Sequence, residues 1–139
     1  MPCPIARALD LIGEWWTLLI LREAFAGVRR FDEFQGNLGI ARNILAARLK
    51  SLVAAGILEK RPLPEEGARR IEYRLSAKGK ALRPILLALA EWGNTFGDCG
   101  PMVAIETTDE GDPVRIAVVN AATGEVVEPK QVRIRRLHA

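Results

Sequence analysis

The side chains best suited to binding chemistry lie together on one predicted helix, residues 41–55. Its apolar residues Leu45, Leu49 and Leu52 recur at helical spacing and predict a buried stripe. The opposite face carries two cations, an amide and two small residues, namely Arg42, Asn43, Ala46, Ala47 and Lys50. Cations and amides can bond to phosphates or base edges, while small residues allow close approach and methyl contact with thymine. This face is therefore predicted to enter the major groove of DNA.

A second group of cations lies on two predicted strands that follow this helix. Residues 57–61 and 70–75 are expected to form an antiparallel hairpin around the polar loop 62–67. The hairpin carries Lys60, Arg61, Arg69 and Arg70 around an acidic tip, Glu65 and Glu66. These cations are expected to contact phosphates, or to place one arginine in the minor groove. We expect Arg69 and Arg70 to contribute more to DNA contact than the tip of the hairpin, because the acidic tip opposes deep insertion of the hairpin into a groove.

Each of these residues also has a structural interpretation. Lys50 could be an ordinary solvated charge, and Asn43 could bond to nearby backbone groups. The arginines before the second strand could balance the acidic tip across the hairpin. Arg48 lies nearer the buried stripe and is expected to be a structural ion-pair partner. The prediction of DNA binding thus depends on the ordered combination of elements and not on any single charge.

Four helices are predicted before the hairpin and one after it. The first ends at Gly13, and the next three cover about residues 15–26, 31–35 and 41–55, each followed by a glycine at 27, 36 or 56. The last covers residues 77–96 with Ser76 as its N-cap, and Pro84 inside it should kink the helix or mark a restart. This order indicates a winged helix-turn-helix, a mainly α fold with a β-hairpin wing. We assign it to residues 1–97, followed by a small β-rich C-terminal extension at residues 98–139.

Composition excludes several classes of protein. The 139 residues are 49% hydrophobic and 27% charged, which is typical of a globular chain, and the net charge of +3 is compatible with a polyanionic partner. We expect no membrane span and no secretory signal, because the apolar runs are short and the N-terminus lacks a basic start. Cys3, Cys99 and His138 are too few to build a zinc site, and no phosphate-binding loop or nucleophile–base pair is visible. The protein is therefore predicted to be neither an enzyme nor a cofactor binder.

The residues named so far fall within a pattern that resembles the HxlR-type regulators. The runs that carry the resemblance are Cys3–Gly13, Trp16–Arg22, Arg30–Phe34, Leu38–Ala41 with Asn43, Tyr73–Ser76, Lys78–Gly79, Pro84 and Trp92–Gly93. The match spans about residues 3–97 in the order and spacing of that family. It implies a cytoplasmic, homodimeric transcriptional regulator with a build like that of MarR-type proteins.

Family dimers form through the N-terminal and C-terminal helices, which the resemblance places at two apolar stripes of this chain. The candidate interface residues are Ile5, Leu9, Ile12, Leu86, Leu89 and Trp92. The alternative is that these residues belong to the core of a single chain. A two-fold dimer would hold its recognition helices about 34 Å apart and would prefer a pseudo-palindromic operator.

Two residues near the N-terminus raise further possibilities. Many relatives sense oxidants or electrophiles through a cysteine at the position of Cys3, which would be exposed just before the first helix. Oxidised Cys3 could form a disulfide with Cys99 or with its symmetry mate, or Cys3 could be an unreactive interface residue. Trp15 stands where the family more often has a basic residue, and it could pack in the core or line a pocket at the dimer interface.

The C-terminal extension shows β patterning without a clear role. Strands are expected at residues 103–105, 114–119 and 132–134, with a turn at 121–124. Residues 123–127 resemble a zinc-ribbon-like tail of some relatives, but the paired cysteines are missing, which argues against metal. The extension could complete a sheet on the dimer, bind a small effector or add basic contacts.

One alternative to DNA binding stays open from the sequence. A winged-helix module can bind proteins without recognising specific DNA. Such a module would associate independently of salt and would tolerate alanine at Asn43 or Lys50, whereas a DNA-binding regulator should show steep salt dependence.

Overall fold

The structure is a computed structural model that describes residues 3–63 and 70–137. The chain divides into two compact units, residues 1–86 and 87–139, with the boundary inside a helix. Each unit is described by itself. The assignment of residues 98–139 as a separate extension stays a prediction.

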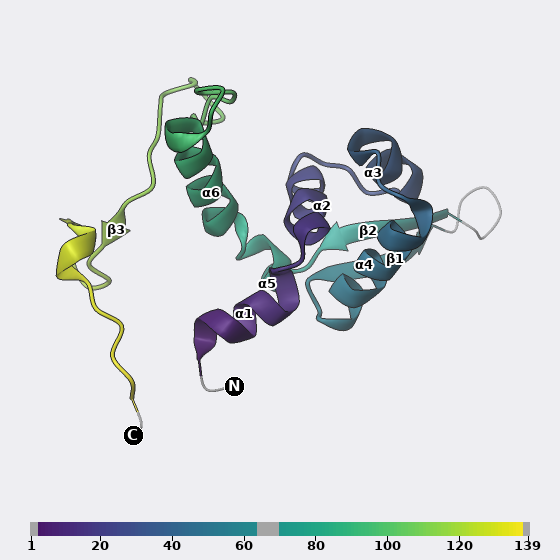
Figure 1. Ribbon diagram of the computed structural model, residues 1–139, viewed down its shortest axis with the longest axis horizontal. Coiled ribbons are helices and arrows are strands. Elements are labelled where there is room, and N and C mark those ends of the chain that lie inside the picture. Colours follow the sequence, from purple (N-terminus) through teal and green to yellow (C-terminus); the bar gives the residue numbers. More distant parts are fainter. Residues whose placement is uncertain (1–2, 64–69, 138–139) are drawn as a thin grey trace. The chain divides into compact units, whose positions relative to one another are not determined.

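The first unit contains the winged helix-turn-helix that the sequence predicts. Its elements are α1 (Pro4–Ile12), α2 (Trp15–Phe25), α3 (Phe31–Leu38), α4 (Arg42–Ala54), β1 (Leu58–Leu63), β2 (Arg70–Leu75) and α5 (Ala77–Lys80) (Figure 1). Figure 1 shows the β1–β2 hairpin running alongside α4, which follows α3 after a short turn. Fold class and element order are thus confirmed.

The ends of α3 and α4 depend on left-handed glycines. Helix α3 does not stop at Gly36, as the sequence suggested, but continues to Leu38 and ends at Gly39, whose φ is 65°. A glycine inside a helix costs only about 1 kcal/mol relative to alanine, so it does not by itself end a helix. The predicted left-handed glycine after α4 is confirmed at Gly56, with φ of 74°.

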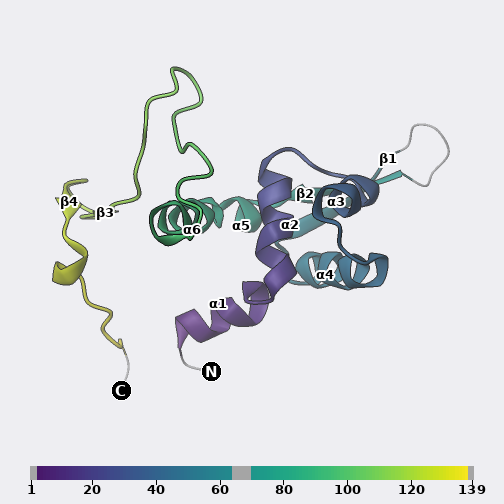
Figure 2. The ribbon, with the colours of Figure 1, turned by 45° about the horizontal axis from the view of Figure 1, so that its top comes forward.

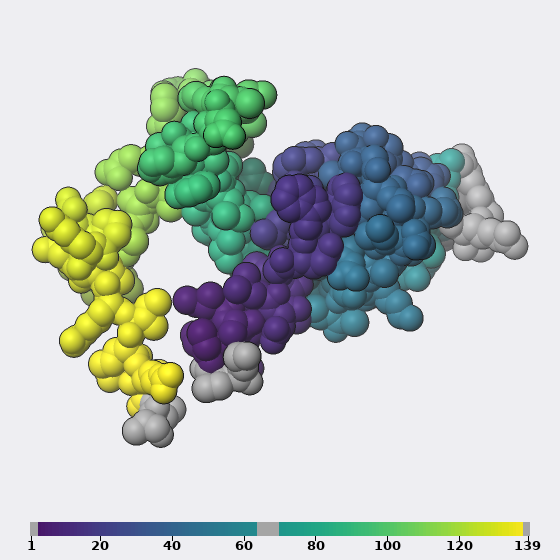
Figure 3. Space-filling model, in the orientation of Figure 1, coloured from purple at the N-terminus to yellow at the C-terminus, as the bar shows by residue number. Residues whose placement is uncertain are grey.

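The core of the first unit lies where α2, α3 and α4 meet the start of the hairpin. Its largest fully buried side chains are Phe34, Ile20, Leu21, Leu45, Leu49, Leu52, Ile57 and Leu58. The predicted stripe of three leucines on α4 is therefore confirmed. In the space-filling view the purple side chains of α2 and the blue side chains of α3 adjoin in one continuous surface (Figure 3). This packing fixes α4 by one face and leaves the other face free.

The hairpin is antiparallel, and its register decides which side chains share a face. Glu59 lies opposite Arg74, Lys60 opposite Tyr73, and Arg61 opposite Glu72. The loop before α3 joins this sheet, because the backbone N–H of Tyr73 donates to the carbonyl of Arg29 at 2.7 Å. Successive side chains alternate between faces, so the pair at 60 and 73 lies on one side and the four charged residues at 59, 61, 72 and 74 lie on the other.

The helix predicted at residues 77–96 is two helices. Ser76 caps α5 as expected, since the Gly79 N–H donates to its Oγ at 3.0 Å. Helix α5 ends at Lys80, and α6 (Arg83–Phe96) begins with Pro84 in its first turn. Of the two alternatives for this proline, the structure shows the restart. Proline is tolerated there because first-turn N–H groups have no partner within the helix.

The second unit contains most of α6 and a small strand pair. Strands β3 (Val118–Val119) and β4 (Val126–Val127) pair antiparallel and are followed by a 3-10 turn, η1 (Pro129–Gln131) (Figure 2). The predicted turn is confirmed, because the N–H groups of Ala122 and Thr123 donate to Oδ1 of Asn120.

The other strand predictions for this unit were too long. No strand forms at residues 103–105 or 132–134 in the described part of the chain, and 114–119 is reduced to its last two residues. A β-branched sequence forms a strand only where a partner strand satisfies its backbone. Near Ile105 the pairing is short: the Val114 N–H donates to the Ile105 carbonyl at 3.0 Å, and Glu106 forms an isolated bridge with Pro113.

Candidate nucleic-acid interface

A tight turn sets the angle between α3 and α4. Gly39 takes the left-handed conformation, Ile40 is 3% exposed and inserts into the core, and Ala41 is the N-cap of α4. The buried Ile40 anchors the turn, so the start of α4 has a defined position relative to α3. This is the geometry of a helix-turn-helix, in which the second helix reads the duplex.

The outer face of α4 carries every residue that the sequence placed there. Arg42, Asn43, Ala46, Ala47 and Lys50 are all exposed. They stand on the side of α4 away from the leucine stripe and stay accessible to solvent. Their exposure is what contact with DNA requires, while the contact itself stays a prediction.

Arg42 is held at the beginning of α4 by residues of α3. Its guanidinium lies 4.8 Å from the ring centroid of Phe31, and Nη1 lies 3.9 Å from Oδ1 of Asp32. Both charged side chains are largely exposed, so the ion pair is weak and can exchange for a phosphate. The stack on Phe31 keeps the cation near the helix start without burying it.

The wing and α4 together form a groove that the sequence did not reveal. The groove has a volume of about 330 Å³ and is lined by Phe31, Ala46, Lys50, Val53, Lys60 and Tyr73. It brings Lys50 of α4 and Lys60 of β1 to one surface. Partial burial raises the pKa of Tyr73 above its ordinary value.

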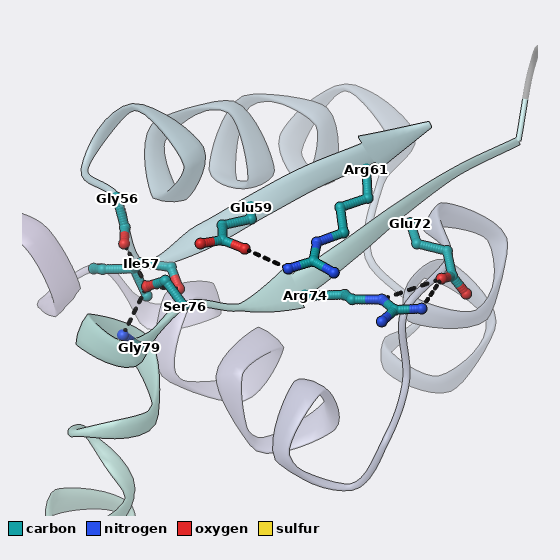
Figure 4. A network of polar contacts seen from close by, with 8 residues as sticks. All are labelled: Gly56, Ile57, Glu59, Arg61, Glu72, Arg74, Ser76 and Gly79. Carbon is teal, nitrogen blue, oxygen red and sulfur yellow. Dashed lines mark hydrogen bonds and ion pairs between the residues drawn. The ribbon is translucent and has the colours of Figure 1, made fainter. Parts of the chain in front are cut away.

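The other face of the wing carries paired charges. Arg61 Nη2 lies 3.1 Å from Oε2 of Glu59, and Arg74 Nη2 lies 2.8 Å from Oε1 of Glu72 (Figure 4). The hydrogen bond from Arg74 lowers the pKa of Glu72, so this carboxylate stays charged. Of the predicted phosphate contacts on β1, Arg61 is ion-paired with Glu59, whereas Lys60 lines the groove beside α4.

The remaining wing predictions lie at the end of the hairpin. Arg70 is exposed at the start of β2. Arg69 and the acidic tip at Glu65 and Glu66 fall outside the described residues, so the predictions for them stay untested.

Arg48 is a structural residue, as the sequence indicated. Its Nε lies 3.9 Å from Oε2 of Glu14, which connects α4 to the start of α2. The same carboxylate accepts a hydrogen bond from the Trp16 N–H at 2.9 Å and so caps α2.

The candidate dimer residues fall into two groups. Ile5, Leu9, Leu89 and Trp92 are between 49% and 65% exposed. Ile12 is only 6% exposed and belongs to the core of the first unit, and Leu86 packs partly against that core. Both therefore serve mainly the single chain, in line with the alternative that the sequence left open. Trp15 is 75% exposed, so the interpretation that it packs in the core was wrong.

Two arginines near the wing were missed as binding candidates. Arg29 and Arg30 are exposed in the loop before α3, and the backbone of Arg30 forms an isolated antiparallel β-bridge with Glu72 of β2. The sequence contained the signal, an arginine pair directly before Phe31, but gave no reason to place that loop against a strand distant in the chain.

Both cysteines are exposed, and neither belongs to a metal-ligating cluster in the described part of the chain. Cys3 is exposed at the N-cap of α1, and Cys99 is exposed and free. No cluster of three or more metal-ligating side chains occurs among residues 3–63 and 70–137. Over the same residues, no helix combines the length and apolar character needed to span a bilayer.

The turn, the exposed face of α4 and the wing define a protein of the winged helix-turn-helix class. Residues 11–100 match the family model for the HxlR-like helix-turn-helix. The chain belongs to this family and is a transcriptional regulator of the HxlR type, as the resemblance implied.

Known relatives agree with this assignment. An uncharacterized HTH-type transcriptional regulator of Mycobacterium tuberculosis is 38% identical over 128 residues, which cover 92% of this chain and 73% of the relative. The crystal structure of PA1607, a candidate transcription factor, has a TM-score of 0.83 at 44% identity, covering 96% of this chain and 94% of that one. The redox regulator HypR in its reduced form has a TM-score of 0.64 at 31% identity, covering 70% of this chain and 96% of that one.

Proposed function

We propose that this regulator binds specific duplex DNA as a homodimer, with α4 of each protomer in a major groove. The observation that carries the proposal is the exposed outer face of α4, with Asn43 and Lys50 on a helix whose other face is buried. The groove beside it adds Lys60 at a position suited to the phosphate backbone. Amide-to-base contacts supply sequence preference, and the lysines supply affinity.

Exposed apolar side chains support the dimer. On α1, Ile5 and Leu9 are each 57% exposed, and on α6, Leu89 and Trp92 are 49% and 65% exposed. Such apolar side chains on successive helical turns are a common feature of helix–helix interfaces. Two-fold symmetry then implies half-sites one helical turn of DNA apart.

Selection of bound fragments from randomised duplex DNA tests this function. The expected result is enrichment of a pseudo-palindrome, with affinity that falls steeply as salt rises. A triple variant with Arg42, Asn43 and Lys50 changed to alanine should keep its fold and enrich nothing. Binding that ignores salt and survives this variant would favour the protein-interaction module instead.

We also infer a response to oxidants through Cys3. The thiol is exposed at the N-cap of α1, on the helix that carries two of the proposed dimer residues. The similarity to HypR, described as a redox regulator, supports this inference. A disulfide from Cys3 to its symmetry mate or to Cys99 would change how the helices of the dimer meet.

Repeating the DNA-binding measurement with and without peroxide tests the oxidant response. Peroxide should change the affinity of the wild-type protein and leave that of Cys3→Ser unaltered. Cys99→Ser distinguishes the two disulfides, because it removes the response only if Cys99 is the partner. A response that persists in Cys3→Ser would remove Cys3 from the sensing role.

A further inference from the structure

A second cavity lies on the side of the wing that carries the paired charges. It has a volume of about 290 Å³ and lies between the C-terminal end of α2, the hairpin and the end of α5. The residues that matter for its chemistry are four cations, Arg29, Arg61, Arg74 and Lys80, over small apolar side chains at Ala24 and Val28. The volume is near the lower limit for pockets that hold small molecules.

The charge around this cavity is not balanced. Glu59 pairs with Arg61 and Glu72 pairs with Arg74, which neutralises two of the four cations. No ion pair joins Arg29 or Lys80 to a carboxylate in the described part of the chain. Two positive charges are therefore left at the cavity. The pKa of Glu72 is lowered chiefly by the hydrogen bond from Arg74, and the charge of Arg29 lowers it in the same direction.

The cavity faces away from the predicted DNA surface. Lys60 lines the groove beside α4, and Arg61, one residue further along the same strand, points to the opposite face of the hairpin. The excess positive charge of this cavity is therefore not explained by DNA binding through α4. Tyr73 is a lining residue of both cavities, although its side chain alternates to the side of Lys60.

We propose that this rear cavity binds a small dianion bearing a carboxylate or phosphate group. Arginine forks bind such groups through two parallel hydrogen bonds, and lysine adds a point charge. The two paired arginines are preorganised by their glutamates, while Arg29 and Lys80 supply the charge that the ligand neutralises. Tyr73 is among the residues that line the rear cavity and also lines the DNA-facing groove, so a ligand bound here lies beside a residue of that groove.

Calorimetric titration of the full-length protein, without DNA, tests the proposal. Inorganic phosphate and succinate are the two probes, each at constant ionic strength, and they distinguish a phosphate from a dicarboxylate ligand. At least one probe should bind with an affinity of about 1 mM or better. Arg29→Gln and Lys80→Gln should each weaken that binding about tenfold. Because no DNA is present, failure here is separate from failure of the proposed DNA binding.

Two control variants locate the site. Arg7→Gln, on the exposed surface of α1, and Lys50→Gln, on the DNA face of α4, should leave probe binding unchanged. When the probe is added to the wild-type protein, the largest changes in amide chemical shift should occur at Arg29, Tyr73 and Arg74. This measurement does not require any variant to fold. These results would support the proposal.

Two results would overturn it. One is the absence of binding by either probe up to about 10 mM. The other is binding that Lys50→Gln abolishes and Arg29→Gln leaves intact, because the anion would then sit on the DNA face. In that second case, a lower salt dependence of DNA binding in Arg29→Gln would assign the cavity to the DNA backbone.

Discussion

Arg48 Nε lies 3.9 Å from Oε2 of Glu14, so the recognition helix and the start of α2 share one carboxylate. The same oxygen accepts from the Trp16 N–H at 2.9 Å and from Thr17 Oγ1 at 3.3 Å, and Thr17 is 4% exposed. Glu14 thus caps α2, satisfies a buried hydroxyl and holds an arginine of α4. The orientation of α4 therefore depends in part on Glu14, which lies outside the exposed face of this helix.

The first prediction follows from these three contacts. Glu14→Ala should lower the free energy of unfolding by about 1–2 kcal/mol, because the cap and the partner of Thr17 are both lost. Urea unfolding followed by circular dichroism measures the change. Glu14→Gln retains an oxygen acceptor and should lower the free energy of unfolding by less. Glu110→Ala, on an exposed turn, is the control and should leave the free energy of unfolding unchanged. Equal stability of Glu14→Ala and wild type would show that water replaces the carboxylate.

Two glycines give opposite expectations for the same substitution. A Cβ at Gly79, which is buried, would clash with the backbone carbonyl of Ile57, whereas a Cβ at Gly36 meets open space. Gly79→Ala should therefore destabilise by about 1–3 kcal/mol through overpacking. Gly36→Ala should stabilise by up to about 1 kcal/mol, because it lies inside α3. Thermal unfolding of both variants checks the pair, and a stable Gly79→Ala would mean that α5 shifts without cost.

Lys50 is expected to contact a phosphate. Lys50→Ala should weaken binding to every duplex and reduce the slope of log affinity against log salt by about 0.9 per lysine, hence by about 1.8 for a dimer. Electrophoretic mobility assays over a range of salt concentrations measure this slope. Lys130→Ala, outside the first unit, is the matched control. An unchanged slope would remove Lys50 from the interface.

Asn43 is expected to act on sequence preference. Asn43→Ala should weaken the free energy of binding to the preferred operator by about 1–3 kcal/mol. Binding to unrelated duplexes should weaken much less, because an amide–adenine pair is lost only where adenine is present. Competition between the operator and a scrambled duplex measures the ratio of the two binding affinities. Equal losses on both duplexes would mean that Asn43 contacts the backbone or only its own helix.

Glu72 should make stability depend on pH. Its pKa is lowered, chiefly by the hydrogen bond from Arg74, so its stabilising contribution is present above the ordinary carboxyl pKa of about 4.3. It is lost as the pH falls through the lower pKa of the folded state. Glu72→Gln and Arg74→Gln should therefore each lose less stability than wild type on acidification from about pH 7 to about pH 3. If the free energy of unfolding falls in parallel with pH for all three proteins, the pair of Glu72 and Arg74 contributes nothing to folding.

The helix-turn-helix and the face of α4 were readable from the sequence because they depend on local rules. Leucines at helical spacing define the buried side of one helix, and Gly56 supplies its left-handed end. The exposed set on the other side follows from the same periodicity, without knowledge of the fold. Arg48 was assigned correctly for the same reason, since it borders the stripe.

The long-range features came only from the tertiary structure. Three features join residues from distant elements. They are the backbone β-bridge between Arg30 and Glu72, the groove that contains Lys50 and Lys60, and the rear cavity with its four cations. Helical and strand periodicity orders side chains within one element, whereas strand register and helix packing decide which elements meet. The charges of this protein could therefore be counted from its sequence, but the two sides of the wing on which they gather are set by the register of β1 and β2.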